Sequence, residues 1–260
     1  QNKFQKKIIK NVVSGFTSDD RGKLIAACGT GKTLTALWIT EEMKNNTVLF
    51  LAPSLALIKQ TLEVWADQAK FPFSYLCVCS DKTVSSDLDD GDISTSELNV
   101  PVTTTPSEIV DFIKTKANSK KYVFSTYQSL QVVAEAMSYT NNFTFDLIIF
   151  DEAHRTAGAK ETQLFGFALT NQSISSKKRL FMTATERLIK PKLKKAAKEA
   201  GKVIFSMDDE ATYGKTFHKY NFGDAILDDV ICNYEIVVAG IQQSDYYKWI
   251  KDNKDLEALV

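Results

Sequence analysis

Residues 23–33 read KLIAACGTGKT, a short apolar run that leads into a glycine-rich turn and then into a helical pattern. Positions 26–33 match the phosphate-binding loop GxxxxGK[ST], with Ala26 in place of the first glycine. Such a loop points consecutive backbone N–H groups at phosphate oxygens, and the following helix N-terminus adds partial positive charge. We expect Lys32 to reach the β- and γ-phosphates of a nucleotide and the Thr33 hydroxyl to hold Mg²⁺. The residues expected to bind the nucleotide here are Cys28, Gly29, Thr30, Gly31, Lys32 and Thr33.

Around this stretch, short β-branched or aromatic runs alternate with amphipathic segments of ten or more residues. This alternation is typical of βαβ units, so we predict an α/β fold with a mostly parallel sheet flanked by helices. Helices are expected near 3–15 (ending at Gly15), 32–44 and 55–69, with Ser54 as N-cap of the last, and after Pro106. Strands are expected at 23–27, 48–51, 74–79, 121–125, 145–150 and 179–183.

A second motif, LIIFDEAH at 147–154, places two acids directly after a buried strand. The carboxyl ends of parallel strands form the edge of the sheet at which ligands bind. Asp151 can hold Mg²⁺ there, and Glu152 can orient and deprotonate an attacking water. By itself an Asp-Glu pair after a strand is more often a surface turn. Joined to the phosphate loop upstream, it predicts a nucleotide hydrolase with Lys32, Asp151 and Glu152 as catalytic residues.

Composition excludes several other classes of protein. The 260 residues carry 32 basic and 32 acidic side chains, so no global field attracts nucleic acid. The longest apolar stretches, such as 147–150, fall far short of the roughly 20 residues that cross a bilayer, so we expect no membrane partner. The four cysteines form no zinc-ligand pattern. Few cysteines and no signal peptide favour the cytoplasm.

Charge is nevertheless unevenly distributed along the chain. Residues 81–100 hold six acids against one lysine, and the Ser-, Thr- and Asp-rich stretch 80–105 is expected to be a mobile insertion. Residues 177–202 hold ten bases against two acids. This basic run is interpreted either as a solvated helix face or as a surface that meets phosphates. Weak strand signals follow at 215–220 and 233–239, with a helix from about 244.

Three further segments extend the match beyond these two motifs. With the DEAH acids, the segments 51–60 (LAPSLALIKQ), 125–130 (STYQSL) and 182–185 (MTAT) resemble the motifs of superfamily 2 helicases and translocases. The stretches at 19–33 and 213–234 are most similar to the restriction subunits of type I, type III and type ISP restriction-modification enzymes. Glu186 departs from the proline that many relatives carry after the Thr-Ala-Thr segment. DEAD-box RNA helicases fit less well, because their second and third motifs read differently.

The resemblance implies roles for individual residues. Gln5 would read adenine of ATP, while the phosphate-loop residues and the two acids would act as described above with Mg²⁺. Residues that would couple the nucleotide state to the nucleic-acid surface are His154, Thr183 and Thr185. Candidates for sugar–phosphate contacts are Ser54, Thr126 and Gln128, for which ordinary capping and turn bonding is the alternative. For His154 the alternative is a structural hydrogen bond to backbone at the end of a helix.

The resemblance also implies a domain organisation. Residues 1–210 would form an N-terminal RecA-like ATPase lobe, and 211–260 would connect it to a second RecA-like lobe outside this chain. Nuclease or methyltransferase modules would likewise lie outside it. The implied function is a DNA motor that hydrolyses Mg-ATP and acts on duplex DNA. The alternatives are an RNA-directed DExH helicase and a nucleotide-binding switch without efficient turnover.

Overall fold

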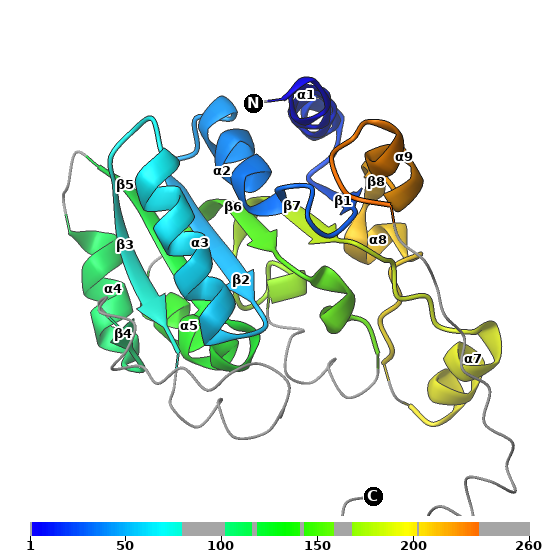
Figure 1. Cartoon of the computed structure of the whole chain (residues 1–260). Coiled ribbons are helices and arrows are strands. Elements are labelled where there is room, and N and C mark those ends of the chain that lie inside the picture. Colours follow the sequence, from blue (N-terminus) through cyan, green and yellow to red (C-terminus); the bar gives the residue numbers. More distant parts are fainter. Residues whose placement is uncertain are drawn as a thin grey trace, which may run out of the picture.

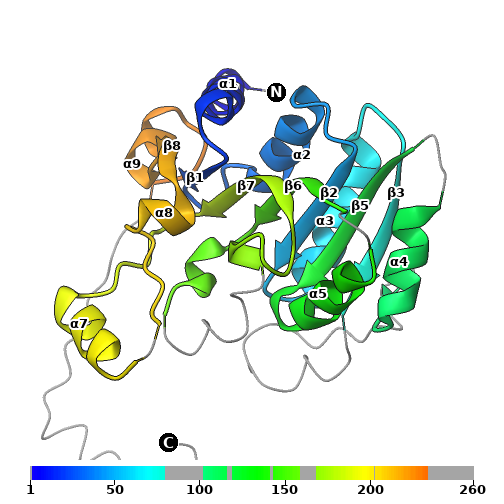
Figure 2. The ribbon, with the colours of Figure 1, turned by 180° about the vertical axis from the view of Figure 1, so that it is seen from behind.

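The computed structural model shows a single sheet with helices on both faces (Figures 1 and 2). Its eight strands lie in the order β4-β3-β5-β2-β6-β7-β1-β8, and every neighbouring pair is parallel. The prediction of a mostly parallel α/β sheet is confirmed. The residues that the structure describes are 2–79, 102–115, 119–140, 143–158, 168–201 and 203–233.

Two strands, β6 and β7, separate β1 from β2 in the sheet. The strands are β1 (Arg21–Ala26), β2 (Thr47–Ala52), β3 (Phe73–Val78), β4 (Val102–Thr103), β5 (Lys120–Thr126), β6 (Phe145–Phe150), β7 (Ser176–Thr183) and β8 (Lys215–Tyr220). The α-helices are α1 (Lys3–Ser18), α2 (Lys32–Glu42), α3 (Leu55–Gln68), α4 (Pro106–Lys114), α5 (Leu130–Ser138), α7 (Pro191–Glu199), α8 (Glu210–Tyr213) and α9 (Phe222–Leu227). Two 3₁₀ turns, η3 (Tyr127–Ser129) and η4 (Ala153–Thr156), follow β5 and β6.

Side chains of the central strands alternate between two hydrophobic cores. In β2, Val48 and Phe50 pack under α1, α2 and α3, whereas Leu49 and Leu51 pack against α4 and α5 on the other face. All four side chains are fully buried. A strand buried on both faces reads as a continuous apolar run, which is why 48–51 was recognisable in the sequence.

The order of the strands brings the sequence motifs to one edge of the sheet. The neighbouring strands β6, β7 and β1 end at Phe150, Thr183 and Ala26, respectively. The DEAH acids, the Thr-Ala-Thr segment and the phosphate loop follow these strands directly. Motifs that are about 120 residues apart along the chain therefore lie side by side, as expected at the carboxyl edge of a parallel sheet.

Three sequence expectations need correction. The first helix runs past Gly15 to Ser18, because Gly15 serves close packing rather than helix termination: a Cβ there would lie 2.3 Å from the Phe217 ring. Within the expected insertion at 80–105, Val102 and Thr103 form the edge strand β4. Beyond residue 210, where we expected the lobe to end, β8 pairs with β1 and continues the sheet.

Other expectations fall on residues whose structure is not described. Positions 80–101 of the expected insertion lie outside the described residues, as do the strand expected near 233–239, apart from its first residue, and the helix expected from 244. Within the described ranges, no helix combines the length and apolar character that a membrane crossing requires.

Candidate functional site

The phosphate loop between β1 and α2 has the backbone conformation that its glycines permit. Gly29 and Gly31 adopt φ angles of 80° and 76°, in the left-handed region that side chains disfavour. Between them, the buried Thr30 donates its hydroxyl to the carbonyl of Ala27 at 2.7 Å. The N–H of Ala27 in turn donates to the Tyr220 carbonyl of β8 at 3.0 Å. The loop is thus fixed at both ends of its turn by β1 and β8.

Lys32 and Thr33 begin α2 at the mouth of this loop. Lys32 Nζ donates to the Ala26 carbonyl at 3.3 Å and lies 4.0 Å from Glu152 Oε1. The first turn of α2 is anchored from α3, since Trp65 Nε1 donates to the Thr33 carbonyl at 3.0 Å. The lysine is therefore held at the carboxyl edge of the sheet, between the loop and the DEAH acids.

Asp151 is buried, and its Oδ1 atom has no hydrogen-bond partner among the described residues. Burial, together with the charge of Glu152, raises the pKa of this carboxyl to about 6. Its backbone is fixed: the N–H donates to the Leu51 carbonyl at 2.8 Å, and the Tyr127 hydroxyl donates to its carbonyl at 2.7 Å. An ionised buried oxygen without a partner is costly unless a cation or water meets it.

This orphaned oxygen fits a divalent cation. Mg²⁺ prefers oxygen ligands and is commonly held in nucleotide sites through one carboxylate, a hydroxyl and phosphate oxygens. The Asp151 carboxylate and the Thr33 hydroxyl are oxygen donors of this kind.

Glu152 occupies a strained backbone position next to Asp151. Its φ and ψ angles of 48° and 47° place a non-glycine residue in the left-handed region, and its carboxylate lies between two basic side chains. One is Lys32, and the other is His154, whose Nδ1 lies 3.3 Å from Glu152 Oε2. The hydrogen bond with His154 holds the pKa of Glu152 below its ordinary value. Glu152 is therefore ionised at neutral pH.

His154 links this acid to the end of β7. Its Nδ1 lies 3.0 Å from Thr183 Oγ1, and Thr183 donates its own hydroxyl hydrogen to the Thr185 carbonyl at 2.9 Å. Because the Thr183 hydrogen is committed, the proton shared with His154 belongs to Nδ1. Lys32, Glu152, His154, Thr183 and Thr185 thus form one continuous polar chain across three strands.

The three candidate nucleic-acid residues differ in exposure and in hydrogen bonding. Ser54 caps α3, its Oγ accepting from the Leu57 N–H at 3.4 Å, as the sequence predicted. Thr126 is buried and donates to Ser129 Oγ at 3.0 Å. Both hydroxyls therefore make the capping and turn bonds that were the alternative interpretation. Gln128, in η3, is the exposed member of the three.

Gln5 lies beside the phosphate loop. It is buried at the start of α1, and its Nε2 atom would lie 3.0 Å from a Cβ placed on Gly31. Its Oε1 atom accepts the Asn2 N–H at 2.9 Å. The side chain is positioned next to the loop, with its carbonyl already bonded.

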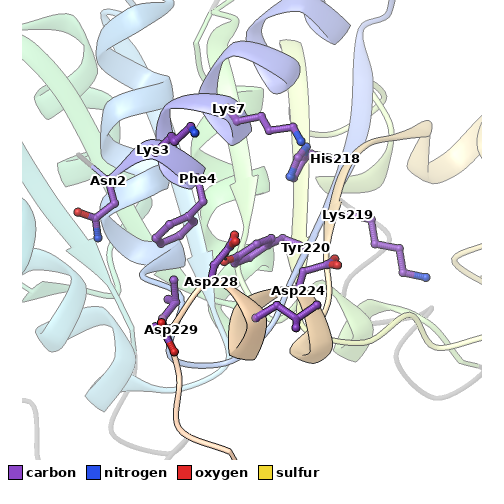
Figure 3. A pocket seen from close by; sticks show the side chains of 12 residues that line it. Asn2, Lys3, Phe4, Lys7, His218, Lys219, Tyr220, Asp224, Asp228 and Asp229 are labelled. Carbon is purple, nitrogen blue, oxygen red and sulfur yellow. Dashed lines mark hydrogen bonds between the residues drawn. The ribbon is translucent and has the colours of Figure 1, made fainter.

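A cavity of about 850 Å³ opens between the start of α1, β8 and the segment around α9 (Figure 3). Its lining comes from the first turns of α1, from β8 and from the segment around α9, and the phosphate-loop residues are absent from it. The Phe4 and Tyr220 rings stack within it at 5.1 Å, and the Tyr220 hydroxyl donates to Asp228 Oδ2 at 3.0 Å. Tyr220 joins the cavity to the phosphate loop through its carbonyl bond with Ala27.

Sequence reasoning missed several residues that shape this edge of the sheet. Tyr127 was part of a quoted motif, yet nothing in the sequence indicated that it fixes the Asp151 backbone. Tyr220 was missed because 215–220 reads KTFHKY, without the apolar run of a central strand. Buried Lys23 and partly exposed Glu186 form an ion pair at 2.7 Å, a contact between positions 163 residues apart. Only the three-dimensional arrangement identifies such partners.

Comparison with known proteins assigns the chain to a family. The profile of the family described as "Type III restriction enzyme, res subunit" matches residues 1–188. The chain belongs to this family. It is a superfamily 2 helicase lobe with a RecA-like fold, close to restriction subunits, as the sequence motifs predicted.

Individual relatives agree with membership of the type III restriction enzyme family. The "Probable helicase A859L" of African swine fever virus is 32% identical over 257 residues, covering 99% of this chain and 26% of the viral protein. A solved structure, "ATP-dependent Type ISP restriction-modification enzyme LlaBIII bound to DNA", has 33% identity and a TM-score of 0.76, covering 98% of this chain and 17% of its own. A nuclease-deletion mutant of the type ISP enzyme LlaGI, in complex with a DNA substrate mimic, has 31% identity and a TM-score of 0.68 over 100% of this chain and 23% of its own. The chain therefore spans about a quarter or less of these relatives.

Proposed function

We propose that this lobe binds Mg-ATP at the carboxyl edge of β1, β6 and β7, hydrolyses it, and serves in a motor that moves along duplex DNA. The observation that carries the proposal is the polar chain from Lys32 through Glu152 and His154 to Thr183 and Thr185. It joins Lys32, which is expected at the phosphates, to Glu152, which is expected at the attacking water. The same chain continues into the segment expected to sense the nucleotide state.

In the proposed reaction, water attacks the γ-phosphate in line with the bond that breaks. The loop N–H groups and Lys32 bind the phosphates, and ionised Glu152 accepts the proton of the attacking water. Mg²⁺, held by Thr33 and Asp151, would supply charge neutralisation between the β- and γ-phosphates. Hydrogen-bonded His154 would orient Glu152 and transmit the change in its charge to Thr183. Gln5 is the candidate for reading the adenine.

Duplex DNA is the proposed nucleic acid. The two restriction enzymes of similar structure are described as bound to DNA or to a DNA substrate mimic. Gln128, exposed after β5, is the side chain proposed to meet the sugar–phosphate backbone. For Ser54 and Thr126, whose hydroxyls bond within the chain, we propose that the backbone of their loops makes the contact.

The other parts of the proposed motor would lie in polypeptide outside these 260 residues. We propose that residues after the described sheet lead to a second RecA-like lobe, that nuclease or methyltransferase modules accompany it, and that the protein works in the cytoplasm. A second lobe would supply an arginine finger, which is worth about 10³–10⁵ in rate. The 260-residue chain alone should therefore hydrolyse ATP slowly.

Single-turnover hydrolysis tests the proposal. With the chain in excess over labelled ATP and Mg²⁺ present, we expect slow phosphate release that Glu152→Gln abolishes, because the amide cannot accept the proton of water. Binding of Mg-ADP should be unchanged in that variant, since Glu152 is not a phosphate ligand. Glu63→Gln, at an exposed position on α3, is the matched control.

The alternatives predict different results. Phosphate release that is equal in native chain and Glu152→Gln would favour a nucleotide-binding switch. Binding of duplex RNA in preference to duplex DNA of the same sequence would favour an RNA-directed helicase.

A further inference from the structure

The basic run identified in the sequence forms α7, which stands apart from the sheet in both views (Figures 1 and 2). Lys192, Lys195 and Lys198 follow one another at three-residue spacing and therefore share one face of the helix. All three are exposed. Among the described residues, Lys195 has one ion pair, a 4.0 Å contact with exposed Glu199, and such surface pairs contribute little.

Four other bases of the run are engaged elsewhere. Lys177 pairs with Asp146 at 2.8 Å, Lys178 donates to backbone carbonyls at the end of α1, and Arg179 is fully buried. Lys194 pairs with Asp208 at 2.7 Å. Lys192, Lys195 and Lys198 thus place three exposed positive charges on one face of α7.

The segment that carries α7 is tied down at both of its ends. Before the helix, the Ile189 N–H donates to Ser206 Oγ at 2.9 Å, and the Arg187 carbonyl accepts the Met207 N–H at 3.2 Å. The Lys194–Asp208 pair adds a third tie. The two segments that flank α7 are therefore bonded to each other, and the helix has a defined position.

These ties continue to the phosphate-loop strand. The buried Lys23 of β1 donates to Glu186 Oε1 and to the Met207 carbonyl, both at 2.7 Å. Lys23 thereby joins the segments that enter and leave the α7 excursion, three residues before Ala26, where the phosphate loop begins. Glu186, which stands where the resemblance implies a proline in many relatives, thus has a partner in Lys23.

We propose that the Lys192, Lys195 and Lys198 row of α7 is a contact surface for the phosphate backbone of duplex DNA, held in a fixed relation to the nucleotide site by the Lys23–Glu186 pair. The proposal rests on the proposed DNA-motor function and adds a surface to it. Phosphate contacts of this kind are independent of sequence and depend strongly on salt. The excursion leaves the sheet at the carboxyl end of β7, the same edge that carries Gln128.

Fluorescence anisotropy with a labelled duplex of about 25 base pairs, between about 50 and 200 mM salt, tests the surface. Lys192→Gln/Lys195→Gln/Lys198→Gln should weaken binding by the 260-residue chain about tenfold or more and lower the slope of log K against log salt by about 2–3. Glutamine keeps the helix propensity of lysine, so α7 should remain folded. The matched control is Lys10→Gln/Lys70→Gln/Lys114→Gln, three exposed lysines on other parts of the chain.

The outcomes separate this surface from the proposed function. Equal affinity and slope in the α7 variant and the native chain would overturn the surface, as would the same loss in the control variant. Absence of duplex binding at low salt by the native chain would overturn it as well. Mg-ADP binding is measured on the same samples. If the native chain does not bind Mg-ADP, the nucleotide site is contradicted. If the native chain binds Mg-ADP and the α7 variant keeps the DNA affinity of the native chain, the α7 surface alone is contradicted.

Discussion

At the scale of single residues, two acidic residues of the candidate site adopt arrangements that lower the stability of the folded chain. Asp151 is buried with one unpartnered oxygen, and Glu152 has a left-handed backbone. Each feature is unfavourable in the chain without ligands. A bound nucleotide and cation would relieve this energetic cost or use the arrangement for binding and catalysis. Such conflicts between local preference and fold are expected at functional sites.

Asp151→Asn should therefore stabilise the metal-free chain. The folded pKa of about 6 exceeds the ordinary value of 3.8, so ionisation at neutral pH opposes folding. This penalty is fully present above pH 6 and disappears as the pH falls towards 4. We expect the variant to gain about 1–3 kcal/mol in free energy of unfolding at neutral pH, and little near pH 4. Urea unfolding in EDTA measures this.

The same variant should lose Mg²⁺-dependent ATP hydrolysis, because the amide is a weaker ligand than the carboxylate. Asp111→Asn, at an exposed position of α4, is the control and should change neither property. A destabilised Asp151→Asn chain would mean that the carboxylate is satisfied by a partner within the fold.

At the scale of elements, the Lys23–Glu186 pair connects β1 with the segments around α7. Breaking one side leaves a buried charge with too few partners, whereas replacing both sides with apolar groups removes the need for either. We expect Glu186→Leu to cost about 1–3 kcal/mol, less than is usual for a fully buried pair, because Glu186 remains partly exposed. Lys23→Met/Glu186→Leu should cost less than Glu186→Leu alone.

Equilibrium urea unfolding of the two single variants and the double variant gives the coupling free energy. Additive losses in the double variant would show that the two charges do not stabilise each other. A second pair, Lys177 and Asp146, has an exposed lysine, lies at the amino-terminal ends of β7 and β6, and should show a smaller coupling.

The elements also show how far sequence reasoning reaches. Strands β2 and β6 were predictable because both of their faces are apolar, and the helix start at Pro106 because proline suits a first turn. Strand β8 was underestimated, since an edge strand carries polar residues such as Lys215, His218 and Lys219. The site motifs were predictable because they are local. The Tyr127–Asp151 and Lys23–Glu186 contacts were not, because they join segments that only the folded sheet brings together.

At the scale of the whole molecule, one edge of the sheet collects the phosphate loop, the acid pair and the Thr-Ala-Thr segment, and the basic α7 excursion leaves from the same edge. This arrangement suits a lobe that exchanges information between a nucleotide and a nucleic acid. The chain spans 26% of its viral relative and 17% of LlaBIII, so the remaining parts of such a machine would come from other polypeptide. Nucleotide binding, by contrast, should be a property of this lobe alone.

Calorimetric titration of Mg-ADP into the 260-residue chain and into Lys32→Ala tests that central claim most directly. Loss of the ammonium removes charge-assisted bonds to phosphate worth about 1.5–3 kcal/mol, so we predict roughly ten- to a hundredfold weaker binding by the variant. Lys114→Ala, at an exposed position on α4, should bind as tightly as the native chain. Equal affinity of native chain and Lys32→Ala, or no binding by either, would contradict the assignment of this loop as a nucleotide phosphate site.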